Sequence, residues 1–189
     1  MRGMRLIHSV RLLTIGSSTK RAKYLREHHV FHCMGEKCTY QRRKLPLYPG
    51  LISIGSNVHL AAGVSLITHD ISHIMLNRLG SRRFTEKVGC IEIGDNVFVG
   101  SGTKILYDVR IGSNVIIGAG SIVTKDIPDN SVAVGTPAKV IGSFEDYLKK
   151  RENEEQYPAE LAPRKQEIGS QLADWCWDRF EKKRNGTKE

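Results

Sequence analysis

Two histidines with the potential for acid–base chemistry lie in the middle of the chain, at His69 in the run Ile67–Thr68–His69–Asp70 and at His73. A neutral imidazole takes up a proton near neutral pH, so either side chain could act as a general base towards a hydroxyl or an amine. A hydrogen-bonded loop histidine without a chemical role fits the same residues, and for His73 that interpretation is favoured. Asp70 follows His69 directly, and adjacent side chains of an extended chain point in opposite directions, so direct support of His69 by Asp70 is not expected.

A second group of histidines and cysteines lies nearer the N-terminus, where it could be considered as a metal site. The residues are His28, His29, His32, Cys33 and Cys38. Their spacing matches none of the common zinc patterns, and we expect no metal. The four cysteines of the chain are scattered, which is typical of reduced thiols in a cytoplasmic protein.

The charge of the chain is concentrated at its N-terminal end. Residues 1–44 hold eleven Lys or Arg against two Glu, which accounts for the whole net charge of +9. Such a segment could touch nucleic acid or an anionic membrane, but it lacks the interleaved aromatic residues of a surface that binds single strands. A solvated helical face is the favoured interpretation. Arg5, His8 and Arg11 interrupt the apolar residues near the start, so we expect neither a signal peptide nor a membrane span.

The elements that must position His69 follow from a six-residue repeat. Beginning at Ile93, the first place of each hexad is aliphatic six times in succession, and the fifth place is also mostly apolar. The first places are Ile93, Val99, Ile105, Ile111, Ile117 and Val123, and the fifth places are Val97, Thr103, Val109, Val115, Ser121 and Ile127. Neither a helix nor a single strand has this period, whereas a solenoid of short strands does. The sequence therefore predicts an all-β solenoid.

The same repeat occurs upstream and is interrupted once. Ile54, Leu60 and Leu66 occupy first places, the rhythm then fails, and it resumes at Ile93. Because the same repeat resumes, we expect residues 70–87 to form a loop ejected from the solenoid directly after His69. Long loops of this kind in compact domains are usually functional or disordered.

Helices are expected at both ends of the solenoid. We predict a basic, mainly helical N-terminal cap at 1–44, with a helix at 17–31. The β-helix is predicted at 45–142, with the repeat continuing to about Ile141. C-terminal helices are predicted at 143–189, the first capped by Ser143 and the second at 164–184. Such segments are suited to closing the ends of a solenoid.

The run Ile91–Gly142 resembles the hexapeptide-repeat acyltransferases, in particular galactoside and maltose O-acetyltransferases and the O-acetyltransferases of bacterial surface sugars. The segments Ser53–Val58 and Ile67–Asp70 resemble the last group as well, so the resemblance spans about Leu51 to Ile141. It implies a left-handed parallel β-helix, a homotrimer and acetyl-coenzyme A as the acyl donor. The zinc carbonic anhydrases share this fold, but the spacing of His59, His69 and His73 does not fit them.

The resemblance also implies roles for individual residues. His69 aligns with the catalytic histidine of the family. The positions that match its cofactor-binding residues are Ser101, Ala119, Thr124, Lys125 and Lys139. Two positions depart from the pattern. Phe98 stands where relatives often have Trp, and Gly142 stands where some relatives have a basic residue, so a phosphate contact there is lost or moved.

These residues together predict an acetyltransferase that moves an acetyl group from acetyl-coenzyme A to a hydroxyl of a sugar or polysaccharide precursor, with His69 as general base. The acceptor is expected to bind near the ejected loop, through Asp70, His73, Arg82 and Arg83. Two alternatives stay open at this point: N-acetylation of an amino sugar or a xenobiotic amine, and a β-helix that serves only as a scaffold.

Overall fold

The computed structural model describes residues 2–80, 82–164 and 167–185. Met1, Ser81, Lys165, Gln166 and residues 186–189 lie outside the described residues, as do the parts of the predicted cap, loop and C-terminal segment that they form. The chain divides into two compact units, Met1–Leu148 and Lys149–Glu189. The first unit contains the solenoid and all the residues predicted to bind donor or acceptor.

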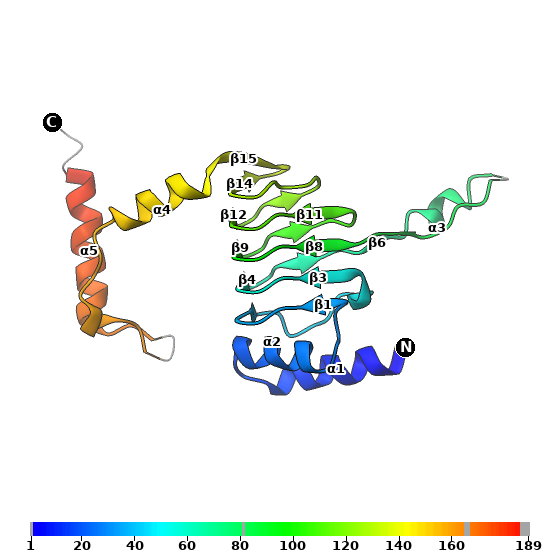
Figure 1. Ribbon diagram of the computed structural model, residues 1–189, viewed down its shortest axis with the longest axis horizontal. Coiled ribbons are helices and arrows are strands. Elements are labelled where there is room, and N and C mark those ends of the chain that lie inside the picture. Colours follow the sequence, from blue (N-terminus) through cyan, green and yellow to red (C-terminus); the bar gives the residue numbers. More distant parts are fainter. Residues whose placement is uncertain (1, 81, 165–166, 186–189) are drawn as a thin grey trace. The chain divides into compact units, whose positions relative to one another are not determined.

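Three sheets of short strands form the walls of the solenoid (Figure 1). The first consists of β1 (Cys33–Met34), β3 (Ile52–Ile54), β8 (Ile91–Ile93) and β11 (Val109–Ile111). The second consists of β2 (Thr39–Tyr40), β4 (Val58–Leu60), β9 (Val97–Val99), β12 (Val115–Ile117), β14 (Ser131–Gly135) and β15 (Ala138–Ser143). The third consists of β5 (Ser65–Leu66), β10 (Lys104–Ile105) and β13 (Ile122–Val123). All these pairings are parallel except that of β14 with β15, which confirms the predicted β-helix.

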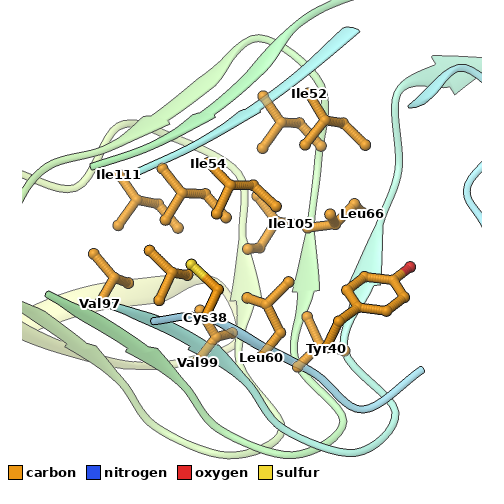
Figure 2. Packing of buried hydrophobic residues seen from close by; sticks show 14 of the residues in the cluster. Cys38, Tyr40, Ile52, Ile54, Leu60, Leu66, Val97, Val99, Ile105 and Ile111 are labelled. Carbon is orange, nitrogen blue, oxygen red and sulfur yellow. The ribbon is translucent and has the colours of Figure 1, made fainter. Parts of the chain in front are cut away.

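The core is the stack of aliphatic side chains that the hexad predicts. All six first-place residues from Ile93 to Val123 are at most 1% exposed, and the fifth-place residues are at most 4% exposed. Figure 2 shows Ile54, Val99 and Ile105, from three different walls, pointing into one shared interior. The two polar residues of the fifth place, Thr103 and Ser121, both donate to the carbonyl oxygen of Gly118, at 3.1 and 2.7 Å. Their burial is therefore compensated by hydrogen bonds.

The spacing of paired strands locates the ejected loop. Partners in neighbouring coils on either side of the arm are 16 to 20 residues apart, as Ile93 and Ile111 are at 18, but Ile54 and its partner Ile93 are 39 residues apart. The extra residues form a projecting arm, described at residues 69–80 and 82–88 (Figure 1). Its base is an antiparallel pair, β6 (His69–Asp70) with β7 (Lys87–Val88), and it carries a short helix, α3 (His73–Leu76).

Two helices precede the first coil, α1 (Arg2–Thr14) and α2 (Ser18–Glu27), and a short 3-10 helix, η1 (Pro49–Leu51), leads into β3. The Ser17 hydroxyl accepts a bond from the Lys20 amide at the start of α2. This helix ends at Glu27, before the predicted end at residue 31, because His29 adopts a left-handed backbone conformation with φ of 46°. Parallel pairing already begins at β1 and β2, so strands of the solenoid occur within the predicted cap.

The prediction that the repeat continues to about Ile141 is wrong. β15 runs antiparallel to β14, and Val140 and Ile141 are 48% and 65% exposed rather than buried. The reversal of the chain after Gly135 takes β15 out of the parallel stack, so its apolar side chains have no coil above them.

α4 (Phe144–Glu152) follows β15 and begins with the predicted cap, in which the Ser143 hydroxyl accepts a bond from the Asp146 amide at 3.0 Å. The second unit holds η2 (Ala159–Leu161) and α5 (Ser170–Asn185). This last helix starts six residues later than predicted, and before it the backbones of Arg164 and Glu167 bond to each other. Across the described ranges, no helix has the length and apolar character needed to cross a membrane.

Because the coils are in close contact, alanine should change the free energy of unfolding by very different amounts at Gly100 and at Gly142. A Cβ at Gly100 would overlap the backbone of Gly118 and Ala119 in the next coil, whereas a Cβ at Gly142 would meet nothing within 4 Å. Gly100→Ala should lower the free energy of unfolding by about 1–3 kcal/mol, the usual range for overpacking. Gly142→Ala should leave it unchanged or slightly raised. Equal effects of the two substitutions in urea denaturation would show that the coils are not packed this closely.

A pH dependence follows from Tyr40, which is 2% exposed in the first coil. Burial raises the pKa of its phenol from 10.0 to about 12. The unfolded chain releases this proton near the ordinary pKa, and the folded chain holds it longer. The contribution of Tyr40 to stability should therefore be complete below about pH 10 and be lost as the pH rises towards about 12, by about 2–3 kcal/mol.

The matched control is Tyr40→Phe, which keeps the ring and removes the ionisable group. Denaturant titrations between about pH 9 and about pH 11 should show a smaller loss of stability in Tyr40→Phe than in the unsubstituted chain. The same loss in both proteins would mean that Tyr40 ionises normally in the folded state.

Candidate active site

The base of the arm places His69 at the edge of the solenoid. The amide of Gly89 donates to the carbonyl oxygen of Thr68 at 3.0 Å, so the chain leaves and re-enters the coil at adjacent points. Immediately outside this bond, His69 pairs with Val88 and Asp70 pairs with Lys87. His69 is therefore held by a rigid wall on one side and by a paired strand on the other.

The ring of Tyr48 contacts His69, and its hydroxyl binds Glu86. The rings of Tyr48 and His69 meet edge to face, with centroids 5.4 Å apart and planes at 79°. The Tyr48 hydroxyl donates to the carboxylate of Glu86, 2.9 Å from Oε1 and 3.0 Å from Oε2. Tyr48, which approaches η1, thus contacts both the imidazole of His69 on β6 and the carboxylate that directly precedes β7.

The imidazole of His69 is half-buried, and its two nitrogens differ in environment. Nδ1 is shielded from solvent and has no hydrogen-bond partner among the described residues. The same holds for the hydroxyl of the neighbouring Thr68 and for Nδ1 of His73 at the start of α3. Buried polar atoms are normally paired, and sites where they are not are often places where a ligand or water binds. Two such atoms at the base of the arm, on Thr68 and His69, and a third on α3 mark this part of the chain as a candidate site.

Asp70 interacts with the arm and the next coil. One carboxylate oxygen accepts a bond of 2.6 Å from the Ser72 amide, and the other lies 3.5 Å from the Tyr107 hydroxyl. The bonds from Ser72 hold the pKa of the Asp70 carboxyl below its ordinary value, with smaller contributions from Tyr107 and Lys87. The ammonium group of Lys87 lies 4.7 Å from the centre of the Tyr107 ring. These contacts tie the root of the arm to the wall that carries β10.

Four of the five residues matched to cofactor binding lie at two corners of one wall. Ser101 and Ala119 are exposed at the corner before β10 and β13, in adjacent coils, where the amide of Gly120 donates to the Ser101 carbonyl. Thr124 and Lys125 follow β13 directly, at the corner from which the arm departs in the coil of β5. The corner of Ser101 and Ala119 presents only small side chains, which suits a thin extended ligand lying close to the backbone.

The remaining basic residue, Lys139, is exposed on β15 and pairs with Val134 of β14. Together with the exposed Lys125 it supplies positive charge at the later coils, where phosphate groups could bind.

The structure does not bring Arg82 and Arg83 to His69 within one chain. Both are exposed on the distal part of the arm, beyond the point where the Asn77 side chain bonds to the backbone of Phe84.

Tyr48 and Glu86 were not predicted as site residues. Glu86 is the single acid of the loop after Asp70, and Tyr48 stands between Pro46 and Pro49, but neither signal indicates that the two side chains meet.

Concerning metals, no group of three or more His, Cys, Asp or Glu side chains that could hold an ion occurs in the part of the chain that the structure describes.

Comparison with known proteins identifies the family of this fold. A family model described as bacterial transferase hexapeptide (six repeats) matches residues 90–125. Protein CapG of Staphylococcus aureus is 48% identical over 101 residues, which cover 52% of this chain and 56% of CapG. The chain spans about half the length of the curated relatives it matches.

Two solved structures match over more of their length. A maltose O-acetyltransferase from Clostridium difficile 630 is 30% identical, with 75% of this chain and 85% of that chain covered and a TM-score of 0.55. A galactoside acetyltransferase in complex with coenzyme A is 31% identical, with 78% and 82% covered and a TM-score of 0.58. With its stack of hexapeptide coils, its arm and its terminal helices, the chain belongs to the hexapeptide-repeat acetyltransferases, a family with the left-handed β-helix fold.

Proposed function

We propose that this protein transfers an acetyl group from acetyl-coenzyme A to a hydroxyl group of a sugar or polysaccharide precursor. The observation that carries this proposal is the environment of His69: a half-buried imidazole at the root of the arm, fixed by a paired strand and by the edge of Tyr48. Similarity to a maltose O-acetyltransferase and a galactoside acetyltransferase supports the chemistry. The unpaired polar atoms of Thr68 and His69 support the binding of a polar ligand there.

In this proposal His69 is the general base. Acetyl-coenzyme A supplies the acyl group as a thioester. As the acceptor oxygen forms its bond to the acetyl carbon, His69 takes the proton of the hydroxyl, and the carbon–sulfur bond breaks. The proton then passes from the imidazole to the sulfur that leaves, which returns His69 to its neutral form. General base catalysis suits a histidine because its ordinary pKa lies near the working pH.

Donor binding is proposed at the two corners described above. Ser101 and Ala119 would lie along the pantetheine arm, where the small side chains let a ligand approach the backbone. Thr124, Lys125 and Lys139 would bind towards the nucleotide, the two lysines neutralising its phosphates. The exposure of all five side chains supports this assignment.

We also propose that the active protein is a homotrimer in which each arm reaches a neighbouring subunit. The arm extends away from its own solenoid (Figure 1) and exposes Ile71, Ile74, Met75 and Leu79, between 46% and 74% each. Contiguous apolar surface of this kind usually marks an interface. His69 of one subunit would then face a donor groove formed largely by the coils of the next.

Replacement of the proposed base should separate catalysis from folding. His69→Ala should lower kcat by about two to four orders of magnitude, the usual range for loss of a general base. Coenzyme A should still raise the melting temperature, because a ligand that binds only the native state stabilises it. His32→Ala, which removes an exposed side chain directly before β1, is the matched control and should keep normal turnover.

The assay is release of coenzyme A in the presence of sugar acceptors, together with a thermal melt of each variant. Full activity of His69→Ala would refute this assignment and make His73 the next candidate. Loss of the coenzyme A effect on melting would show instead that His69 belongs to the donor site.

The arm should control the acceptor rather than the donor. Arg82 and Arg83 can pair with carboxylate or phosphate groups, so Arg82→Ala with Arg83→Ala should raise the KM of an anionic acceptor about tenfold or more. The KM of acetyl-coenzyme A should hardly change. Arg164→Ala with Lys182→Ala removes two exposed charges from the second unit and serves as the control. A rise in the donor's KM alone would assign the two arginines to the cofactor phosphates.

A further inference from the structure

The first helix, α1, is fixed to the rest of the unit by one face only. Leu12 is fully buried in the core, and Nδ1 of His8 lies 2.8 Å from the Tyr24 hydroxyl of α2. The end of α1 is held as well, because the Arg43 guanidinium donates to the carbonyl oxygen of Leu13 at 2.8 Å. The helix is therefore a rigid part of the structure, with a fixed outer face.

The outer face of α1 is apolar and exposed. Leu6, Val10 and Leu13 recur at helical spacing and are 66%, 55% and 59% exposed. With 3.6 residues per turn, they lie on the side of the helix away from His8 and Leu12. Ile7, 59% exposed, widens this side. We call Leu6, Ile7, Val10 and Leu13 the α1 stripe. A contiguous apolar patch of this kind on a rigid helix usually marks a binding surface.

The charge around the α1 stripe is positive. Of the two acidic residues in the first 44, Glu27 pairs with Lys23 at 3.6 Å and Glu36 with Arg26 at 2.7 Å. Exposed basic side chains close to α1 in the chain and the fold include Arg11, Lys20, Arg43 and Lys44. An apolar stripe with a cationic surround is the pattern of a helix that lies in the plane of an anionic lipid surface.

We propose that α1 binds the surface of an anionic lipid bilayer, with the α1 stripe buried among the acyl chains and the basic residues at the level of the headgroups. At 13 residues α1 is about 20 Å long, too short to span a bilayer but sufficient to lie along its surface. A second copy of the chain fits this face less well, because joining two α1 stripes would bring two strongly basic segments together.

The place of α1 allows this binding without blocking the candidate active site. α1 and α2 lie across the N-terminal end of the coil stack, next to β1, whereas the arm projects from its side (Figure 1). The inference is independent of the acetyl-transfer proposal, since it rests only on α1 and the charges near it.

The test uses the full chain and sedimentation with vesicles. The protein should sediment with vesicles of phosphatidylcholine and phosphatidylglycerol, sediment little with phosphatidylcholine alone, and be released as the salt concentration rises. Leu6→Ser with Val10→Ser keeps every charge and should weaken binding about tenfold or more, because about five carbon atoms of leucine and valine side chain are no longer transferred from water into the bilayer.

The matched control replaces two apolar side chains exposed elsewhere, Leu148→Ser with Ile168→Ser, and should bind vesicles like the unsubstituted chain. Both positions of the α1 variant are solvent-exposed, and a thermal melt checks that it is folded. Equal sedimentation with neutral and anionic vesicles, or undiminished binding by the Leu6→Ser/Val10→Ser protein, would overturn the proposal. So would a smaller oligomer in this variant without lipid, which would identify a second copy as the occupant of the stripe.

Discussion

Hydrogen bonds between successive coils determine where every other part of the first unit lies. Each short strand bonds to the equivalent strand of the next coil, 16 to 20 residues away except across the arm, and this register brings one first-place aliphatic side chain directly over another. At one corner the side chains of Asn57, Asn96, Asn114 and Asn130 repeat this contact as an amide ladder, with distances of 2.8–2.9 Å. The first step of the ladder spans the arm, so the arm leaves the stack without changing its register. Strands of two or three residues would be unstable alone, and only their stacking gives them a buried side.

The constant register of the coils determines how firmly the arm is attached to the solenoid. Because the coils on both sides keep their register, the root of the arm is as rigid as the wall it leaves, and the bond between Thr68 and Gly89 closes it. His69 is the first residue outside that bond. It therefore combines a fixed position with access to solvent and to the arm, which a histidine inside a coil would lack. The Tyr48–Glu86 hydrogen bond adds a second constraint from outside the stack.

The parts of the fold that could be predicted are those that repeat. The buried first and fifth places follow directly from the hexad, and the break after Leu66 indicates the ejected loop. The first coil was not predicted, because Cys38 and Tyr40 fill its interior without any repeat around them. The antiparallel β15 has the composition of another coil and reverses only through the turn after Gly135. In the site, Tyr48 and Glu86 are 38 positions apart in irregular segments, so only the fold brings them together. The exposure of the α1 stripe could not be predicted for a related reason. The composition shows the charge of the segment, but it does not show which side of the helix remains exposed to solvent.

In the proposed trimer, acetyl transfer takes place between subunits, with His69 of one facing the donor groove of the next. The most direct test mixes two chains with different defects, His69→Ala and Ala119→Trp, the second filling the donor corner with a bulky ring. Refolded together into mixed trimers, the pair should recover part of the activity that neither chain has alone, because one interface in such a trimer joins an intact His69 to an intact groove. Mixed trimers that form, as shown by mass measurement, but stay inactive would contradict the account, as would a fully active monomer.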